Sequence, residues 1–187
     1  MVILVLNCGS SSIKYQVIDM EAASSKVLAK GIVERIGLAE GDLVHKPVGK
    51  ERFELRQPIP DHTTGIRLVL DALTDPAHGV IRSLDEVKAV GHRVAHGGEF
   101  FPESCLVTEE VKEKIRSLFE IAPLHNPANL EGVLSIEKVL PGVPQVTVFD
   151  TSFHQTIPAV NFMYALPHAY YDKYRVRKYG FHGTSHK

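Results

Sequence analysis

Apolar residues alternate with short turns over the first sixty positions, and this pattern predicts a series of strands. Residues 2–6 form a continuous branched apolar run, and residues 13–18 carry an apolar residue at every second position, as in a fully buried and a half-buried strand respectively. The same criteria place strands at 27–36, 43–48 and 52–55. The chain is therefore expected to open as a meander of extended segments.

Beyond residue 60 the apolar spacing changes to that of helices. Three predicted helices begin at residues whose side chains can bond free backbone N–H groups, namely Asp61, Thr108 and Asn126. Two further apolar strands, 87–94 and 146–149, alternate with them. The predicted order, in which a run of strands is followed by strands that alternate with helices, indicates the α/β class with a mixed sheet covered by helices.

The composition is that of a globular protein, and it excludes some classes of partner but does not indicate a function. The 187 residues have a formal charge of -1, with 44% hydrophobic and 23% charged residues, which is typical of a globular protein and does not suggest a nucleic-acid partner. Cys8 and Cys105 lie far apart, as expected for reduced thiols. No apolar run approaches the ~18 residues of a membrane span. We expect a cytoplasmic protein that binds neither membranes nor nucleic acid.

The segment NCGSSSIK combines a glycine, three hydroxyl groups and a lysine directly after a buried strand. Gly9 exposes the backbone, and Lys14 supplies a cation, a combination suited to holding phosphate groups with N–H donors. The segment lacks the second glycine and the following helix of a Walker A loop. It indicates either a phosphate-binding hairpin turn or an ordinary Ser-rich turn.

The segment GHRVAHGG places Arg93 at the end of an apolar strand. A guanidinium group there can form two parallel hydrogen bonds to a carboxylate or a phosphoryl group. The alternative is an arginine paired with a structural acid. His92 and His96 have the spacing of two metal ligands on a helix, but the neighbouring glycines argue against a helix, so we do not expect zinc.

Polar residues end three of the predicted strands. Asn7, Arg93 and Asp150 each lie at a carboxyl end, and ligands of open α/β sheets bind at that edge. We therefore expect these side chains to face one cleft.

Two further histidines are candidates for the same cleft. His125 precedes the predicted third helix, where it can donate to an anion with help from the helix dipole; its alternative is a capping or packing role. His182 lies between Phe181 and Gly183 in a short turn, and its alternative is a residue that only begins a helix.

Together, five segments carry a resemblance to a known family: LNCGSSSIKYQVID, GHRVAHGG, APLHNPANLEG, VFDTSFH and YGFHGTSH. In order and spacing they resemble the amino-terminal part of the acetate kinase family, within the superfamily of actin, sugar kinases and heat-shock ATPases. The resemblance implies a ribonuclease H-like (actin-like ATPase) domain with a mixed five-stranded sheet flanked by helices over residues 1–150. Residues 151–187 would begin a second domain.

The resemblance also implies reversible phosphoryl transfer between ATP and a short carboxylate, with Mg²⁺ as the metal ion. On the nucleotide side, Asn7 would help to hold the metal. The phosphates of ATP or ADP would be lined by Gly9, Ser10, Ser12 and Lys14.

On the acid side, the family resemblance assigns Arg93 to the carboxylate or its phosphoryl adduct and makes His125, His182 and Asp150 catalytic. Both histidines would contact the transferring phosphoryl oxygens. A simple carboxylate is already ionised at neutral pH, so no proton has to be removed from it. We therefore expect Asp150 to orient Mg²⁺ or its water ligands.

The apolar end of the acid would meet Ala95, Leu124 and Phe181. Many members of the family carry valine where this chain has Ala95, and the smaller residue leaves room for one more methylene, worth roughly 1 to 3 kcal/mol of discrimination. Propionate is therefore an alternative substrate. A noncatalytic actin-like nucleotide-binding module is the alternative from another class, although it would need no carboxylate-binding arginine.

Members of the family are about twice as long as this chain and form homodimers. We therefore expect an amino-terminal part that, on its own, binds nucleotide weakly and forms acyl phosphate at a negligible rate, because other family site residues would lie after Lys187.

Overall fold

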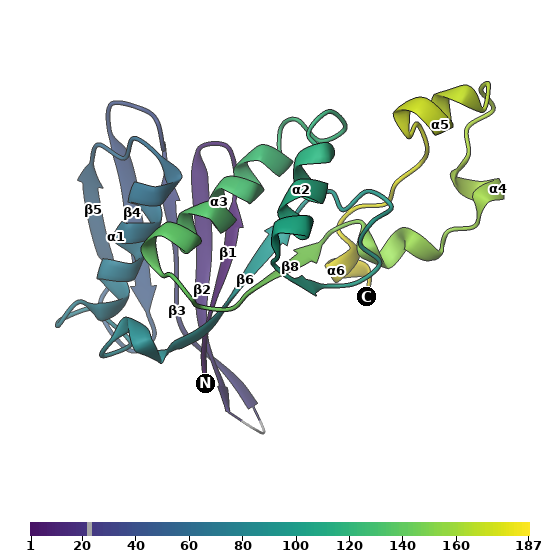
Figure 1. Cartoon of the computed structure of the whole chain (residues 1–187). Helices are drawn as coiled ribbons and strands as arrows, with labels where there is room; N and C mark the ends of the chain where they lie inside the picture. Colours follow the sequence, from purple (N-terminus) through teal and green to yellow (C-terminus); the bar gives the residue numbers. More distant parts are fainter. Residues whose placement is uncertain (22–23) are drawn as a thin grey trace.

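In this computed structural model, which describes residues 1–21 and 24–187, one sheet runs through the molecule (Figure 1). Its strand order is β5-β4-β3-β2-β1-β6-β8-β7. The strands are β1 Val2–Cys8, β2 Ser12–Glu21, β3 Ser24–Glu34, β4 Gly41–Pro47, β5 Phe53–Gln57, β6 Val87–Val94, β7 Cys105–Leu106 and β8 Gln145–Phe149.

The expected number of five strands is wrong, because the sheet formed by the described residues has eight. Its centre, β3-β2-β1-β6-β8, is the expected mixed arrangement: β1, β6 and β8 are parallel, and β2 and β3 are antiparallel to their neighbours. The hairpin of β4 and β5 continues the pairing outward from β3. At the opposite edge, β7 is only two residues long, too short to leave an alternating pattern in the sequence.

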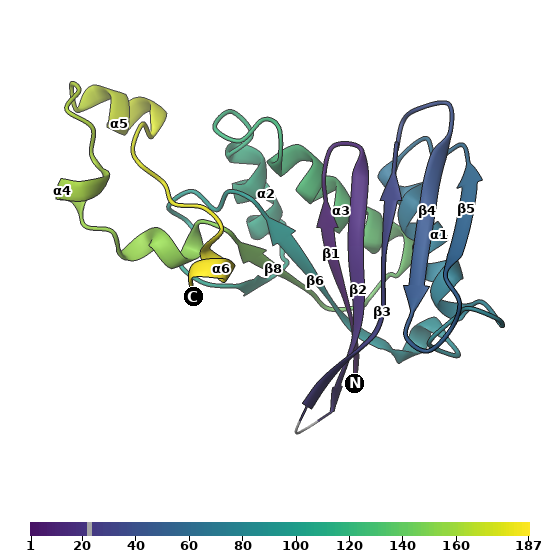
Figure 2. The same ribbon diagram turned by 180° about the vertical axis from the view of Figure 1, so that it is seen from behind.

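The helices are α1 His62–Thr74, α2 Glu109–Ser117, α3 Asn126–Val139, α4 Ala159–Phe162, α5 Ala169–Tyr174 and α6 Gly183–His186. Two short 3-10 helices, η1 Leu84–Glu86 and η2 Ser152–Thr156, complete them. Figures 1 and 2 place α1 and α3 side by side on one face of the sheet. Within the described ranges no helix crosses the other face of β1 to β4, which is turned toward the viewer in Figure 2.

The core lies between this helical layer and the sheet. Every second residue of β1 (among them Leu4 and Leu6) and of the first half of β2 (among them Ile13 and Val17) is buried, so one face of each strand packs against the helices there. A second cluster surrounds Phe149, whose ring stacks on that of Phe101 with centroids 4.1 Å apart. This packing fixes the end of β8, from which Asp150 follows.

Two of the three predicted N-caps are confirmed. The Asp61 carboxylate accepts a hydrogen bond from the Thr64 N–H at 2.7 Å, and the Thr108 hydroxyl accepts one from the Val111 N–H at 3.3 Å. The predicted cap at Asn126 is wrong: His125 occupies the cap position, without a side-chain capping bond. The Asn126 side chain instead bonds the backbone of His96.

Residues 151–187 extend beyond the sheet. In both views α4 and α5 lie away from α1 and α3, and the chain then returns so that α6 lies near β8 (Figures 1 and 2). A hydrogen bond of 2.9 Å from the Gly183 N–H to the Asp150 carbonyl anchors this return. A domain boundary at residue 150 stays a prediction.

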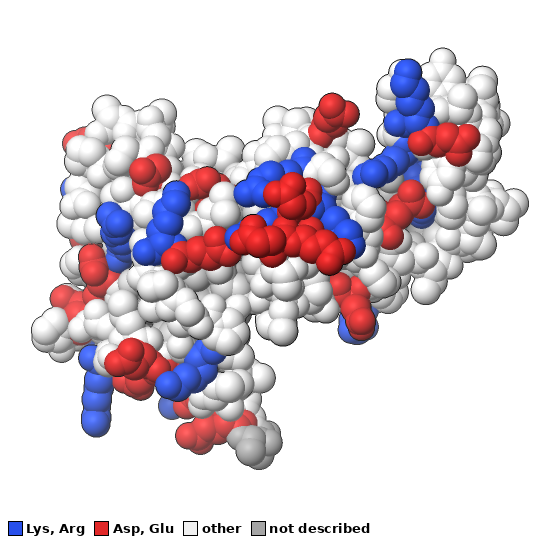
Figure 3. Space-filling model, viewed as in Figure 1, with Lys and Arg blue, Asp and Glu red and all other residues white. Residues whose placement is uncertain are grey.

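The surface carries both signs of charge. On the face seen in Figure 3, acidic and basic side chains interleave over α2 and α3, where the Lys112 ammonium bonds Glu137 at 2.8 Å and Glu109 at 2.6 Å. Lys112 therefore ties the two helices together.

None of the helices described is both long and apolar enough to span a membrane.

Candidate active site

A cavity of about 660 Å³ opens at the carboxyl ends of the parallel strands β1, β6 and β8. The predicted convergence of Asn7, Arg93 and Asp150 is confirmed, because all three line this one cavity. The complete lining is Asn7, Cys8, Gly9, Ser12, Lys14, Arg93, Ala95, His125, Asn129, Asp150, Phe181 and His182.

Arg93 and Asp150 form a two-point ion pair inside the cavity. Arg93 Nε donates to Asp150 Oδ1 at 2.9 Å, and its Nη2 donates to Oδ2 at 2.6 Å. The Asp150 side chain is 5% exposed and that of Arg93 is 42% exposed. The hydrogen bond to Asp150 raises the pKa of Arg93. The guanidinium plane is thus held by a buried acid while part of it still faces the cavity. The pairing with an acid is observed, and contact of Arg93 with a ligand stays a prediction.

His182 approaches the same carboxylate from the returning chain. Its Nδ1 lies 4.0 Å from Asp150 Oδ2, and its side chain is largely exposed. The residue has a left-handed backbone, φ 53, which is uncommon outside glycine. A Cβ at the next position, Gly183, would lie 2.5 Å from the Asp150 carbonyl oxygen. Only glycine therefore lets the backbone come close enough to present His182 to the cavity.

His125 reaches the cavity from the start of α3. It lies at the N-cap position but makes no capping hydrogen bond with its side chain, so the capping interpretation is not what the geometry shows. The imidazole lines the cavity beside a helix N-terminus, where unpaired N–H groups favour an anion.

The Ser-rich segment forms the turn between β1 and β2. The Gly9 N–H donates to the Ser12 carbonyl at 2.8 Å, and the Gly9 carbonyl accepts a bond from His62 Nε2 at 2.7 Å. His62, buried at the start of α1, supports the turn and was missed from the sequence. The only feature of the sequence that pointed to His62 is its position directly after the predicted N-cap Asp61.

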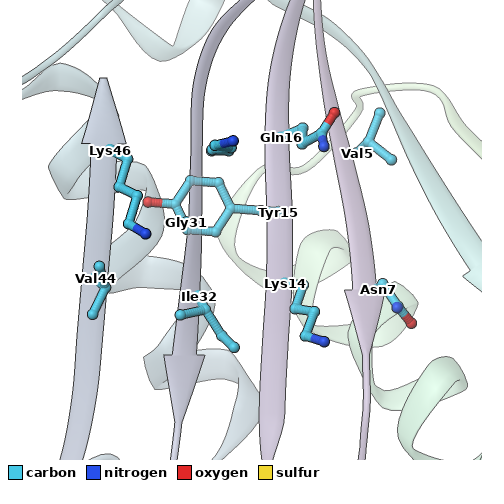
Figure 4. Close-up of a pocket in the computed structure, with 10 residues that line it drawn as sticks. Val5, Asn7, Lys14, Tyr15, Gln16, Gly31, Ile32, Val44 and Lys46 are labelled. Carbon is cyan, nitrogen blue, oxygen red and sulfur yellow. The ribbon is translucent and has the colours of Figure 1, made fainter. Parts of the chain in front are cut away.

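Asn7 and Lys14 lie opposite each other across the β1–β2 pair and also line a second hollow of about 540 Å³ on the open sheet face. Figure 4 shows this hollow, with Lys14 on β2, Lys46 on β4 and the ring of Tyr15 reaching from β2 toward Gly31 on β3. The hollow contains neither the arginine, the acid nor the histidines of the first cavity. The first cavity is therefore the candidate active site.

Two predicted site residues are not brought into the active-site cavity. Ser10 is exposed at the tip of the turn, and Leu124 is 77% exposed. Neither lines the cavity, whereas Ala95 and Phe181 do. Leu124 precedes His125 in the tight turn that leads into α3, and neighbouring residues of such a turn face different sides. This arrangement gives Leu124 no contact with the cavity.

Asn129 and Asn126, one turn apart on α3, are site-supporting residues that sequence reasoning missed. Asn129 Oδ1 accepts from the Ala95 N–H at 2.9 Å, and its Nδ2 donates to the Cys8 carbonyl at 2.6 Å. Asn126 bonds both the N–H and the carbonyl of His96, at 3.1 and 2.8 Å. The only sequence signal is two asparagines at helical i, i+3 spacing, in a segment where the pattern predicts Asn126 as a cap.

His92 and His96 have structural surroundings rather than those of metal ligands. His92 bonds Gln145 at 2.7 Å, and burial lowers its pKa to about 4. Burial also lowers the pKa of His96 to about 4, and its ring packs edge-on against Tyr179 and Phe181. His96 thereby positions the segment that carries His182.

The cavity offers oxygen ligands for Mg²⁺ but few of them. Asn7 and Asp150 both line it, and each Asp150 oxygen that accepts one bond from Arg93 keeps further acceptor capacity. Among the residues that the structure describes, no three His, Cys, Asp or Glu side chains gather to hold a metal. Mg²⁺ commonly takes one or two protein oxygens and completes its shell with water and substrate phosphates, and these residues fit that mode.

Comparison with known proteins agrees with this geometry. The model of the Acetokinase family matches residues 2–187. The acetate kinase of Desulfitobacterium hafniense (strain DSM 10664 / DCB-2) is 55% identical over 187 residues, which are 100% of this chain and 46% of the relative. That of Symbiobacterium thermophilum is 58% identical, with 100% and 46% covered. The chain thus spans about half the length of these relatives.

Solved structures show the same likeness. The Porphyromonas gingivalis acetate kinase superposes with a TM-score of 0.94 at 49% identity, covering 99% of this chain and 46% of that one. A propionate kinase from Francisella tularensis subsp. tularensis SCHU S4 gives 0.89 at 39% identity, with 99% and 46% covered. The expected actin-like ATPase fold is confirmed, and the chain belongs to the acetokinase family.

Proposed function

We propose that the protein carrying this chain transfers a phosphoryl group reversibly between ATP and acetate, giving acetyl phosphate and ADP. The observation that carries the proposal is one cavity lined by an arginine, two histidines and a Ser/Lys turn. The names of the relatives, acetate kinases, support the same reaction.

The β1–β2 turn is assigned to the nucleotide. The backbone around Gly9, the Ser12 hydroxyl and the Lys14 ammonium would bind its phosphates, because N–H groups and a cation suit anionic oxygen. Ser10, at the exposed tip, would reach the outer phosphate edge. The His62 bond to Gly9 holds the turn in shape.

The acid binds on the opposite side of the cavity. The part of Arg93 that Asp150 does not engage would hold the substrate carboxylate, and Ala95 and Phe181 would contact its methyl group. Leu124, outside the cavity in this structure, would need a rearranged turn to join them. The carboxylate oxygen then points toward the phosphates without any proton to lose.

The chemical step needs alignment and charge neutralisation, since phosphoryl transfer spreads negative charge over the equatorial oxygens of a loose transition state. His125 and His182 lie where they can donate to those oxygens. Asp150 is assigned a positioning role toward Arg93, in addition to binding water ligands of a metal.

Mg²⁺, held by Asn7 and by Asp150 through water, would neutralise charge on the phosphates when bound. The assignment of the metal, a homodimer of the full-length protein and a cytoplasmic location complete the proposal and stay predictions.

Acyl phosphate trapping tests the proposal. The full-length protein should form acetyl hydroxamate from ATP, acetate and hydroxylamine. Arg93→Ala should lower kcat/KM for acetate by about 100-fold or more, the scale of losing a charge-assisted double hydrogen bond. The surface variant Arg116→Ala should change it by less than about twofold. No hydroxamate from the unsubstituted protein would overturn the proposal.

Propionate is a second candidate substrate, favoured by Ala95 in the cavity wall and by the similarity to a propionate kinase. The kcat/KM ratio of propionate to acetate should fall by about 10-fold in Ala95→Val, because the added methyl groups occupy the space of one methylene. A strong acetate preference that Ala95→Val leaves unchanged would reject this candidate.

A further inference from the structure

The active-site cavity begins where two parallel strands separate. The pairing of β1 with β6 runs as far as Leu6 and His92. Beyond that point β1 leads into the turn at Gly9, and β6 leads to Arg93 and Ala95. The end of β1 therefore lies on the proposed nucleotide side of the cavity, and the end of β6 lies on the proposed acid side.

One buried side chain bridges this gap. Asn129, 5% exposed, accepts from the Ala95 N–H at 2.9 Å and donates to the Cys8 carbonyl at 2.6 Å. Its amide thus takes the place of a peptide group between strands that no longer bond each other directly. Both polar ends of the amide are used, and each backbone partner lies within two residues of a proposed substrate-binding residue.

The helix that carries Asn129 cannot move freely. A Cβ at Gly132, one turn further along α3, would lie 2.5 Å from Cys8 Sγ, so the helix is already in close contact with β1. At the other end, Asn126 bonds both backbone groups of His96. The position of the Asn129 amide is therefore fixed by contacts on both sides.

We infer that Asn129 is a positioning residue that sets the separation between the phosphate-binding turn and the acid-binding side of the cavity. This inference rests on the proposed phosphoryl transfer. Asn129 touches neither reacting atom in this role. It acts through the backbone of Cys8 on the turn and through the backbone of Ala95 on the acid side.

The role has a kinetic signature that loss of stability alone does not have. Each substrate would still bind to its own side, so the two KM values change little. The attacking and transferring atoms would no longer meet in line, and a displacement of about 1 Å can cost on the order of 100-fold in rate. The loss should therefore fall on kcat.

The test compares Asn129→Ala and Asn129→Asp with Ser135→Ala in the full-length protein. Ser135 is fully buried on the same helix and bonds the Thr63 hydroxyl at 2.9 Å, but it does not line the cavity. Its loss therefore controls for a missing buried hydrogen bond on α3. Asn129→Asp keeps an acceptor for Ala95 and removes the donor to Cys8, so it serves if the alanine variant does not fold.

Assayed well below their Tm, Asn129→Ala should lose about 100-fold and Asn129→Asp at least about 10-fold in kcat. Asn129→Ala, which adds no charge to the cavity wall, should keep both KM values within about threefold of the parent. Ser135→Ala should keep the parent kcat. A folded Asn129 variant with parental kcat, or a loss carried by KM alone, would overturn the inference. An inactive parent would instead overturn the proposed function.

Discussion

At the scale of single residues, the ion pair of Arg93 with Asp150 explains how a charged residue is tolerated at the end of an apolar strand. The sequence allowed either a ligand contact or a structural acid. The geometry supplies the acid, and that acid is itself a candidate catalytic residue. The pair therefore links the stability of the cavity to its chemistry.

Removing one member of this pair should destabilise the fold. Arg93→Ala leaves a buried carboxylate without its counter-charge, and the expected loss is about 2 kcal/mol, below the range for fully buried pairs because Arg93 is partly exposed. Urea unfolding at pH 7 measures it. Adding Asp150→Asn should recover part of the loss, and a double variant no more stable than Arg93→Ala would contradict this.

Buried histidines should make the protein sensitive to mild acid. Burial lowers the pKa of His92 and of His96 from 6.5 to about 4, and it also lowers that of His45. As the pH falls, these histidines are protonated in the unfolded chain before they are protonated in the folded protein. The stability that the neutral, buried histidines contribute is therefore complete above pH 6.5 and is lost as the pH falls toward 4.

The measurement is the urea midpoint between pH 7 and 4.5. At about 1.4 kcal/mol for each pKa unit, His92 alone should account for a loss on the order of 2 kcal/mol across that range. His92→Gln, which can keep a donor toward Gln145, should show a shallower decline than the parent. Equal declines in the two proteins would rule out His92 as a source.

At the scale of elements, pattern and capping predicted most of what local sequence determines. The strand at 87–94 and the helix caps at Asp61 and Thr108 are confirmed, because buried alternation and cap chemistry are local properties. The role of Asn129 could not be predicted, since its partners Ala95 and Cys8 lie 34 and 121 residues away. The cap prediction for Asn126 fails for the same reason, because its observed partner, His96, lies 30 residues away.

The contact of α3 with β1 gives a prediction at this scale. Gly132→Ala gains about 1 kcal/mol of helix propensity, but the added Cβ would crowd Cys8 Sγ, and overpacking costs about 1 to 3 kcal/mol. We expect a net loss of about 1 kcal/mol in urea unfolding. In a Cys8→Ala background the sulfur is removed but the Cβ of residue 8 still lies 3.1 Å from the added Cβ, so the same substitution should cost clearly less than in the parent. A loss of equal size in both backgrounds would show that the close approach is not limiting.

At the scale of the whole molecule, the site arises from topology. The carboxyl ends of parallel strands share one edge of a sheet. The convergence of Asn7, Arg93 and Asp150 could therefore be predicted, because each lies at the carboxyl end of a predicted strand. The convergence of His182 depends instead on the return of residues 175–182 past His96, which no local pattern encodes. The second hollow on the open sheet face, with Lys30 and Lys46, was likewise invisible in the sequence.

A structure of the full-length protein with ADP, Mg²⁺, aluminium fluoride and acetate tests the central claim most directly. We predict acetate on the free edge of Arg93 and the fluoride group, which mimics the transferring phosphoryl, within hydrogen-bond distance of His125 and His182. Ligands bound in the hollow beside Lys30 and Lys46, with the cavity of Arg93 and Asp150 left without them, would contradict the account.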